Sequence, residues 1–260
     1  MKIALIGFGN MGSAIYRGLL KIYAAKDILV CDKNAAAIKT IPRGNLFTDA
    51  NSVLVKTDVV ILAIKPQQFQ ELAEGLNVDL KDKLMISIMA GVSIAKIQKL
   101  TGAKKVMRSM PNLAASVGES LTGWVASRSA KPADKKLAKK IFTSFGAEIE
   151  LKNENMINSL TALSGSGPAY FFYLTELLQK KAERLGFDAE QAKMIAEKTL
   201  LGSAGLIGLN LKDAADWRKS VTSKGGTTEK AIEHMKNKGI GRIVFGAVDK
   251  AKKRAEELNQ

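Results

Sequence analysis

The stretch "KIALIGFGNMG", residues 2–12, decides the fold, because a short apolar run leads directly into Gly7, Gly9 and Gly12. This G-x-G-x-x-G spacing between a strand and a helix is typical of a dinucleotide-binding turn. The first glycine permits the tight turn, the second lets the backbone approach a pyrophosphate, and the third allows close packing of the helix. We therefore expect the whole loop to bind a dinucleotide: Gly7, Phe8, Gly9, Asn10, Met11 and Gly12.

The segments that follow alternate between apolar strands and helices. The sequence predicts strands at 27–32, 58–66, 83–91 and 104–112, and helices at 12–24, 34–41, 94–101 and 133–145. "SLTGWVAS" (120–127) predicts one more strand, at an edge of the sheet. Nearly continuous apolar strands imply a parallel sheet that is covered by helices on both faces. We therefore predict an α/β fold whose residues 1–152 form a Rossmann domain with a doubly wound, mostly parallel sheet.

Strand patterns are absent from the sequence after residue 152. Helical patterns separated by glycine cover 167–186, 188–208, 211–221, 227–239 and 240–258. In the first of them the apolar face "AYFFYLTELL" (169–178) is too wide for a helix on the surface of a monomer. We expect residues 153–260 to form an all-helical domain that binds substrate and dimerises.

The composition excludes several kinds of chemistry. The chain has one cysteine, Cys31, and one histidine, His234, so a disulfide within the chain and a cysteine or multi-histidine metal site are ruled out. We expect no metal. His234 lies near the predicted end of a helix, where histidine commonly interacts with the last carbonyl groups.

The formal net charge of +15 raises the question of nucleic acid. Aromatic residues make up only 6% of the chain, and the basic runs 131–140 and 250–259 have helical spacing with acidic residues among or after the lysines. This pattern indicates solvated helix faces rather than a nucleic-acid surface. No apolar run is long enough to span a membrane, and the N-terminus lacks a signal cleavage site. We expect a cytoplasmic protein that binds neither nucleic acid nor membranes.

The sequence leaves the choice of dinucleotide open. Asp32 follows Gly12 by twenty residues and ends the second strand, where an acidic residue accepts the ribose 2′-hydroxyl of NAD(H). Lys33 and Asn34 come next and are suited to the 2′-phosphate of NADP(H), which we favour slightly. Ligands bind at the carboxyl ends of parallel strands. We therefore expect residues that follow other strands to line the same cleft: Ala63, Ile64, Lys65, Pro66, Ala90, Gly91 and Asn112.

Two helix starts in the second domain are rich in small and hydroxyl residues. "LSGSGPAY" places Ser164, Gly165, Ser166 and Gly167 before a proline, and "TSKGGTTEK" (222–230) breaks a helical region at two glycines. Each is either a simple connection with a helix cap or a cradle of backbone N–H groups for an anion. Two such starts, in the domain without the cofactor loop, suit a small anionic substrate.

The motifs "GFGNMG", "AIKP", "MRSMPN", "ALSGSGPAY" and "VTSKGGTTEKAI", in this order, resemble pyrroline-5-carboxylate reductase over nearly the whole chain. The resemblance implies NAD(P)H-dependent reduction of an imino acid, 1-pyrroline-5-carboxylate, to L-proline in the last step of proline biosynthesis. It also implies a helical domain that interlocks with a partner subunit. The expected assembly is a homodimer, often with five dimers together as a decamer.

The resemblance also suggests roles for individual residues. The substrate carboxylate is expected against the N–H groups of Gly226, Thr227 and Thr228, beside Gly225. Thr228 Oγ1 is expected to hydrogen-bond the ring nitrogen, with Ser223 assisting. Lys65 would hold the cofactor or relay a proton. Ser164 to Gly167 would shape the far wall of the site, either in the same subunit or in a partner subunit. The chain departs from the usual family residues at four positions: Leu113, Ala114, Asn158 and Lys224.

Two other functions remain open at this point. A related two-domain 3-hydroxy acid dehydrogenase would share the cofactor loop and the helical second domain, with a lysine of that domain as general acid. A non-enzymatic NADP-sensing protein would bind the nucleotide without turning over any imine or oxo acid.

Overall fold

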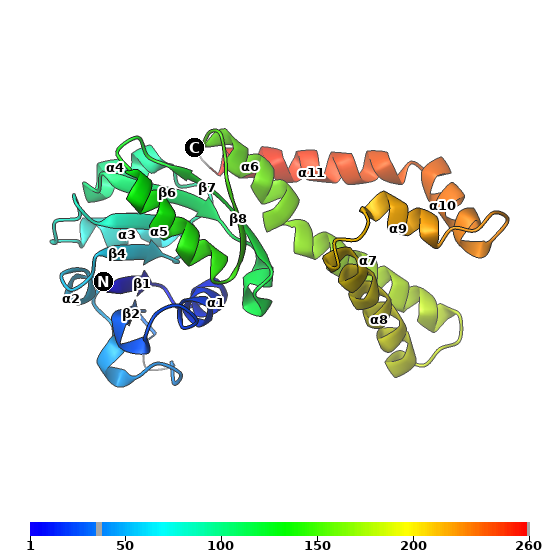
Figure 1. Ribbon diagram of the computed structural model, residues 1–260, viewed down its shortest axis with the longest axis horizontal. Helices are drawn as coiled ribbons and strands as arrows, with labels where there is room; N and C mark the ends of the chain where they lie inside the picture. The colour runs from blue at the N-terminus through cyan, green and yellow to red at the C-terminus, as the bar shows by residue number, and fades with distance from the viewer. Residues whose placement is uncertain (35–37, 259–260) are drawn as a thin grey trace. The chain divides into compact units, whose positions relative to one another are not determined.

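The computed structural model describes residues 1–34 and 38–258 (Figure 1). The chain packs as two compact units. The first, here called the Rossmann unit, consists of Met1–Ser166 and the C-terminal segment from Ala251 onward. The second, the helical unit, is Gly167–Lys250.

An eight-stranded sheet forms the centre of the Rossmann unit, in the order β3-β2-β1-β4-β5-β6-β7-β8. Neighbouring strands are parallel except β6 and β7, which are antiparallel. The predicted Rossmann fold with a mostly parallel sheet is therefore confirmed. The strands are β1 Ile3–Ile6, β2 Ile28–Cys31, β3 Leu46–Phe47, β4 Val59–Leu62, β5 Leu84–Ser87, β6 Lys105–Met110, β7 Ser120–Ala126 and β8 Gly146–Glu150.

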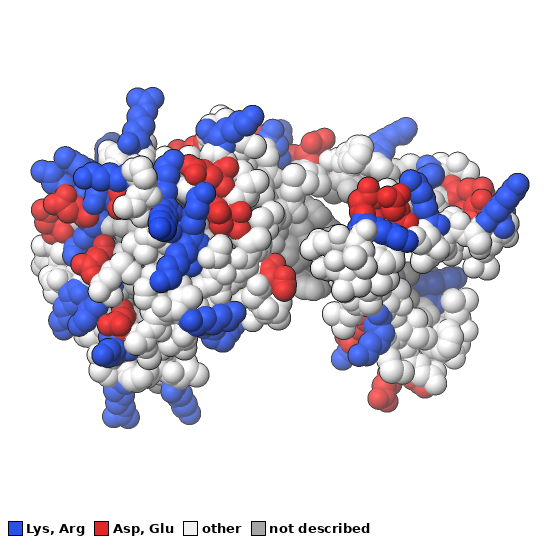
Figure 2. Space-filling model, in the orientation of Figure 1, with Lys and Arg blue, Asp and Glu red and all other residues white. Residues whose placement is uncertain are grey.

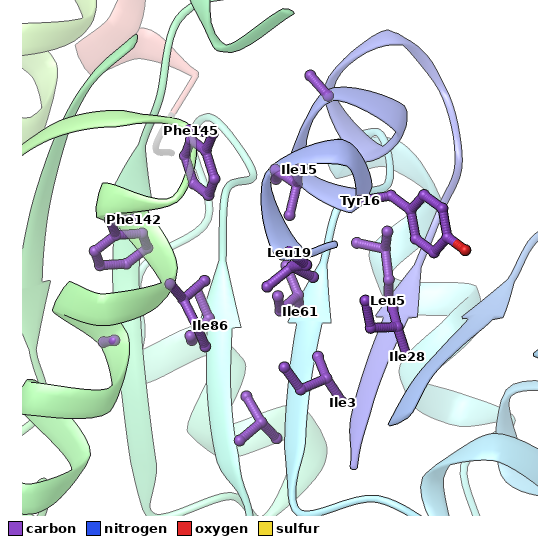
Figure 3. Packing of buried hydrophobic residues seen from close by; sticks show 14 of the residues in the cluster. Ile3, Leu5, Ile15, Tyr16, Leu19, Ile28, Ile61, Ile86, Phe142 and Phe145 are labelled. Atoms are coloured by element: carbon purple, nitrogen blue, oxygen red, sulfur yellow. The ribbon is translucent and has the colours of Figure 1, made fainter. Parts of the chain in front are cut away.

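The side chains of each central strand alternate between two apolar layers. Ile3 and Leu5 of β1 belong to the layer that also contains residues of α1 (Asn10–Leu19) and α5 (Pro132–Thr143). In Figure 3, Phe142 of α5 lies beside Ile86 in this layer. Ala4 and Ile6 belong to the opposite layer, with α2 (Ala50–Leu54), α3 (Phe69–Glu74) and α4 (Ile94–Thr101). All four residues of β1, β2, β4 and β5 are buried, which is why these strands appear in the sequence as continuous apolar runs.

Two local predictions need correction. The strand at 120–127 is present as β7, but its predicted place at the edge is wrong, because β8 pairs with it on the far side. In β8 only Ala147 and Ile149 are apolar, and Ile149 is exposed, so the segment lacks the apolar run that marks the buried strands. The helix predicted at 34–41 includes residues 35–37, which lie outside the described residues. Residues 38–41 form no helix.

The described residues from 153 onward contain no strand, as predicted. α6 (Asn155–Leu160) and a π-helical turn at Thr161–Gly165 belong to the Rossmann unit, where Ile157 packs with Met110 and Leu151. The change from strands to helices near residue 152 thus precedes the change of packing unit, and the division into 1–152 and 153–260 stays a prediction. The remaining helices are α7 Gly167–Arg184, α8 Ala189–Gly208, α9 Ala214–Ser220, α10 Thr227–Asn237 and α11 Ile240–Glu257. Short 3₁₀ helices occupy Ala25–Asp27, Arg43–Asn45, Pro66–Gln68 and Leu113–Val117.

Large apolar side chains of the helical unit remain exposed in the single chain. On α7, Phe171, Phe172 and Tyr173 are 59%, 58% and 61% exposed. Other exposed apolar residues lie on α8 and α11: Met194, Ile195, Leu201, Ile207, Ile243, Val244 and Phe245. Apolar area of this extent marks a surface that another molecule covers.

Candidate active site

The glycine loop before α1 accepts no larger residue at two of its positions. Gly7 has a φ of +98°, and a Cβ atom there would lie 2.6 Å from the carbonyl oxygen of Ala63. A Cβ atom at Gly12 would lie 2.2 Å from the carbonyl oxygen of Gly7. The two glycines therefore let the start of α1 rest directly on the ends of β1 and β4.

Gly9 has a different environment, because a Cβ atom there would meet nothing within 4 Å. It is the N-cap residue of α1 and provides no side-chain hydrogen bond to the helix. The first N–H groups of this ten-residue helix, at the positive end of its dipole, are therefore left for an external acceptor. This arrangement fits the pyrophosphate of a dinucleotide.

A pocket of about 470 Å³ opens at this loop. It lies at the carboxyl ends of β1, β2 and β4, the edge at which such sheets bind ligands. The sequence anticipated many of its lining residues: Gly7, Phe8, Gly9, Asp32, Lys33, Asn34, Ala63, Ile64 and Lys65.

Asp32 is held in place by two backbone groups. Its Oδ2 accepts from the Phe8 N–H at 2.7 Å, and its Oδ1 accepts from the Asn34 N–H at 2.8 Å. Beside it, Lys33 Nζ forms an ion pair with Glu71 Oε1 of α3 at 2.8 Å. The carboxylate thus links the glycine loop to the turn after β2, where a dinucleotide places its adenosine ribose.

The other predicted cofactor residues lie outside the lining of the pocket. Asn10, Met11 and Gly12 continue into α1, and Pro66 begins a 3₁₀ helix. Gly91 has a φ of +72°, and a Cβ atom there would lie 2.3 Å from the carbonyl oxygen of Leu258. The absence of a side chain at Gly91 therefore lets the backbone of Leu258 pack directly against it. Ala90 packs beside Met110, Leu151 and Ile157. Contact of these residues, and of Asn112, with a cofactor stays a prediction.

Sequence reasoning missed the opposite wall of the pocket, which comes from the segments after β3 and around α3. The signal was weak because β3 has only two residues, although Asp49 before Ala50 is a recognisable helix cap. Hydrogen bonds from Ser52 hold the pKa of Asp49 below its ordinary value. The missed residues are Ile6, Cys31, Thr48, Asp49, Ala50, Asn51, Gln68, Glu71, Leu72, Gly75 and Leu76.

In the helical unit, "TSKGGTTEK" forms the predicted break between α9 and α10. Gly225 has a φ of +77°, and its N–H donates to Glu229 Oε2 at 2.7 Å. We had expected the N–H of Gly226 to be free for an anion. This expectation is wrong, because the group donates to the carbonyl oxygen of Ser223 at 3.0 Å. The loop is therefore stabilised by its own hydrogen bonds before α10 begins.

The next two N–H groups are available. Gly226 is the N-cap of the eleven-residue α10 and supplies no side-chain cap. Within residues 1–34 and 38–258, the backbone amides of Thr227 and Thr228 and the Thr228 hydroxyl donate no hydrogen bond. A Cβ atom at Gly226 would lie 2.7 Å from Ser223 Oγ, so the serine hydroxyl lies beside this helix start. The geometry suits a small carboxylate.

The second small-residue motif contains the π-helical turn. Ser164 and Gly165 lie in this turn, Ser166 follows it, and Gly167 begins α7. Asn112 Nδ2 donates to Ser164 Oγ at 3.0 Å, which ties the turn to the loop after β6. Single π-turns within helices are frequent at functional sites.

Charged side chains of both signs lie close together on the Rossmann unit. Figure 2 shows lysine and arginine side chains interspersed with acidic ones on this face of the Rossmann unit. In the run 131–140, Lys135 pairs with Glu150 at 2.5 Å, and Lys139 lies 3.9 Å from both Glu148 and Glu150. No group of three metal-ligating side chains occurs among the described residues. Within the same residues, no helix is both long and apolar enough to cross a membrane.

The glycine loop, the pocket at the strand ends and the parallel sheet define a dinucleotide-binding protein. Two family models match the chain: "NADP oxidoreductase coenzyme F420-dependent" at residues 2–91 and "Pyrroline-5-carboxylate reductase dimerisation" at residues 154–258. A pyrroline-5-carboxylate reductase of Pasteurella multocida is 35% identical over 100% of this chain and 98% of its own length. One from Methanosarcina acetivorans is 34% identical over 100% and 98%.

Solved structures agree over the whole chain. A pyrroline-5-carboxylate reductase from Coxiella burnetii has a TM-score of 0.92 at 34% identity, covering 100% of this chain and 98% of its own. The Plasmodium falciparum enzyme with NADP bound has a TM-score of 0.85 at 25% identity, with the same coverage. The chain belongs to the pyrroline-5-carboxylate reductase family. This membership favours the reductase over the hydroxy acid dehydrogenase and the nucleotide sensor.

The family also explains the exposed apolar face. The dimerisation model covers all of α7, α8, α9, α10 and α11, and most of the large apolar side chains on α7, α8 and α11 are exposed in the single chain. The chain therefore self-associates, and an interface on the wide apolar face of α7 stays a prediction.

Proposed function

We propose that this protein is an enzyme that reduces 1-pyrroline-5-carboxylate to L-proline with NADPH, with NADH as the alternative donor. This reaction is the last step of proline biosynthesis. The observation that carries the proposal is the presence in one chain of two helix starts without side-chain caps, α1 at the dinucleotide pocket and α10 in the dimerisation region. The first suits a pyrophosphate and the second suits the carboxylate of a small substrate.

The α10 start binds the substrate in this proposal. The N–H groups of Thr227 and Thr228 hold the carboxylate, and the hydroxyl of Ser223 assists beside Gly226. Gly225 and Gly226 provide the backbone path that exposes these donors, with Glu229 fixing the Gly225 N–H. Because the carboxylate is fixed at one point, the five-membered ring takes a defined orientation.

Thr228 Oγ1 has the central chemical role. It hydrogen-bonds the ring nitrogen and stabilises it as the double bond between carbon and nitrogen is reduced. The nicotinamide cofactor, when bound, supplies the hydride. Lys65 lines the dinucleotide pocket, and its Nζ forms no ion pair among the described residues. In this proposal Lys65 holds the cofactor or passes a proton. Ser164, Gly165, Ser166 and Gly167 contact a substrate, in the site of this subunit or in that of a partner subunit.

The Rossmann unit binds the cofactor. The N–H groups after Gly9 take the pyrophosphate, and Asp32, Lys33 and Asn34 contact the adenosine ribose. Homodimers are the basic assembly, and five of them form a decamer. The enzyme works in the cytoplasm and has neither a nucleic acid nor a membrane as partner. The ion pairs between the basic runs and neighbouring acidic residues support the absence of a nucleic-acid surface.

The test is oxidation of NADPH and of NADH by the purified protein with 1-pyrroline-5-carboxylate, followed by absorbance at the nicotinamide band. We expect turnover with the imine, formation of proline, and no turnover with 3-hydroxy or 3-oxo acids. Tight nucleotide binding without any turnover of the imine would refute the proposal and support a nucleotide sensor instead.

A further inference from the structure

One ion pair in the dinucleotide pocket involves the lysine that is expected to recognise NADPH. Lys33 Nζ lies 2.8 Å from Glu71 Oε1, and both residues line the pocket. They come from different elements, the turn after β2 and helix α3, so the contact depends on the tertiary fold. The two side chains are 70% and 72% exposed, which leaves both free to change partners.

The pocket around this pair is rich in carboxylates. Asp32, Asp49 and Glu71 line it, whereas its cations are Lys33 and Lys65. Asp32 is fixed by the Phe8 and Asn34 N–H groups, and its oxygens have lone pairs left for a ribose hydroxyl. A 2′-hydroxyl therefore finds an acceptor here. A 2′-phosphate, which carries between one and two negative charges, meets like charges unless Lys33 is free to neutralise it.

We propose that Glu71 is a specificity-determining residue that weakens the preference for NADPH by competing with the 2′-phosphate for Lys33. This inference rests on the proposed function, because it concerns the cofactor of that reaction. A phosphate at the ribose 2′ position must displace Glu71 from Lys33 and accept the nearby negative charge. NADH makes no demand on Lys33, so its binding is independent of the ion pair.

The experiment uses the adenosine half of each cofactor as a probe. 2′,5′-ADP represents the half of NADPH that carries the 2′-phosphate, and 5′-AMP represents the corresponding half of NADH. Calorimetric titration of the Glu71→Gln variant should show 2′,5′-ADP bound about fivefold more tightly, the size expected for an exposed charge pair. The affinity for 5′-AMP should change less than about twofold. The ratio of kcat/KM for NADPH to that for NADH should rise by the same factor. In a Lys33→Ala background the Glu71→Gln change should give no more than a small part of this gain.

Glu74→Gln is the matched control. Glu74 lies on the same helix, accepts a hydrogen bond from Gln70 Nε2 at 3.0 Å, and does not line the pocket. An equal gain from Glu74→Gln would refute the role of Glu71 by attributing the effect to net charge. Equal changes for both probes, or a full gain without Lys33, would also refute it while the proposed reaction stands. If the unaltered protein binds neither probe and oxidises neither NADPH nor NADH with the imine, the proposed function fails as well.

Discussion

The Rossmann unit buries most of its large apolar residues, whereas the helical unit leaves most of its own exposed. In the Rossmann unit the central strands are wholly buried and two apolar layers cover the two faces of the sheet. In the helical unit, α7 buries only Gly167 and Ala182, α8 buries only Ala192 and Ala196, and neither α9 nor α10 has a buried residue. One unit has a core of its own, whereas the other exposes the residues that would form one.

This difference separates two kinds of information in the sequence. An apolar run or a helical period predicts a strand or a helix. It does not say whether the residues that pack on the apolar face belong to the same chain or to another one. For the Rossmann unit the cover is intramolecular. For the helical unit, a match to a dimerisation model and exposed phenylalanines on α7 and α11 point to a second copy. The predictions below test the two units in turn.

The largest effect is expected from Phe172→Asp on α7. Phe172 is 58% exposed in the single chain, and a charge in its place would be desolvated in a dimer interface at two symmetric positions. We expect dissociation into monomers at micromolar concentration, loss of at least about 2 kcal/mol per protomer of association free energy, and loss of activity. Light scattering and the assay above measure these effects.

Val55→Asp is the control, because Val55 is equally exposed, at 60%, but lies in the Rossmann unit just after α2. It should leave the oligomer and the activity unchanged. A Phe172→Asp protein that stays dimeric would show that α7 is not the interface and would break the comparison between the two units.

A smaller and more local effect is expected from Gly12→Val in the Rossmann unit. The new Cβ would overlap the carbonyl oxygen of Gly7, which is backbone and cannot move aside. We expect a destabilisation of about 3 kcal/mol, as for overpacking in a core, together with loss of nucleotide binding. Thermal unfolding and calorimetric titration measure the two effects, and the oligomer should persist.

Gly9→Asp separates charge from packing in the same loop. A Cβ at Gly9 has open space, so the unfolding free energy should stay within about 0.5 kcal/mol of the original. The carboxylate should nevertheless weaken NADPH and NADH alike, because it meets the pyrophosphate. Unchanged affinity in the folded Gly9→Asp protein would remove the glycine loop from the cofactor site.

The sequence predicted most of the Rossmann unit because its signals are local. Continuous apolar strands and the spacing of Gly7, Gly9 and Gly12 need no knowledge of distant contacts. The missed parts are those without a local signal: the two-residue β3, β8 with its two glutamates, and the pocket wall at 48–51 and around α3. That wall is brought to the glycine loop by the sheet order, which no single segment encodes.

In the helical unit the helices were predicted to within a few residues, because glycines separate them. The sequence did not predict in the same detail which surfaces cover the apolar faces of these helices. In the Rossmann unit, the π-helical turn around Ser164 was also missed, since its hydrogen bond to Asn112 joins residues that lie 52 positions apart. At "TSKGGTTEK" the break was predicted, but the bond that occupies the Gly226 N–H became evident only from the folded loop.

The smallest structural change is expected from Thr228→Val, which retains the size, the β-branch and the backbone donor of the threonine. Its hydroxyl has no partner among the described residues, so its loss should leave the unfolding temperature and the oligomer unchanged. We expect kcat to fall on the order of a hundredfold, as for removal of one donor to a developing charge. The KM for the imine should change much less, because the carboxylate still meets the N–H groups of Thr227 and Thr228.

Thr222→Val is the matched control for this variant, since it makes the same change in the same loop. The Thr222 hydroxyl already donates to the carbonyl oxygen of Arg218 at 2.6 Å, so it is not available to a substrate. Its kcat should stay within about threefold of the original, because a single hydroxyl bonded to the end of the preceding helix contributes little. If Thr228→Val and Thr222→Val have the same kcat, the Thr228 hydroxyl does not contact the reacting nitrogen. A fall in kcat confined to Thr228→Val would mean that the helical unit supplies chemistry as well as an interface.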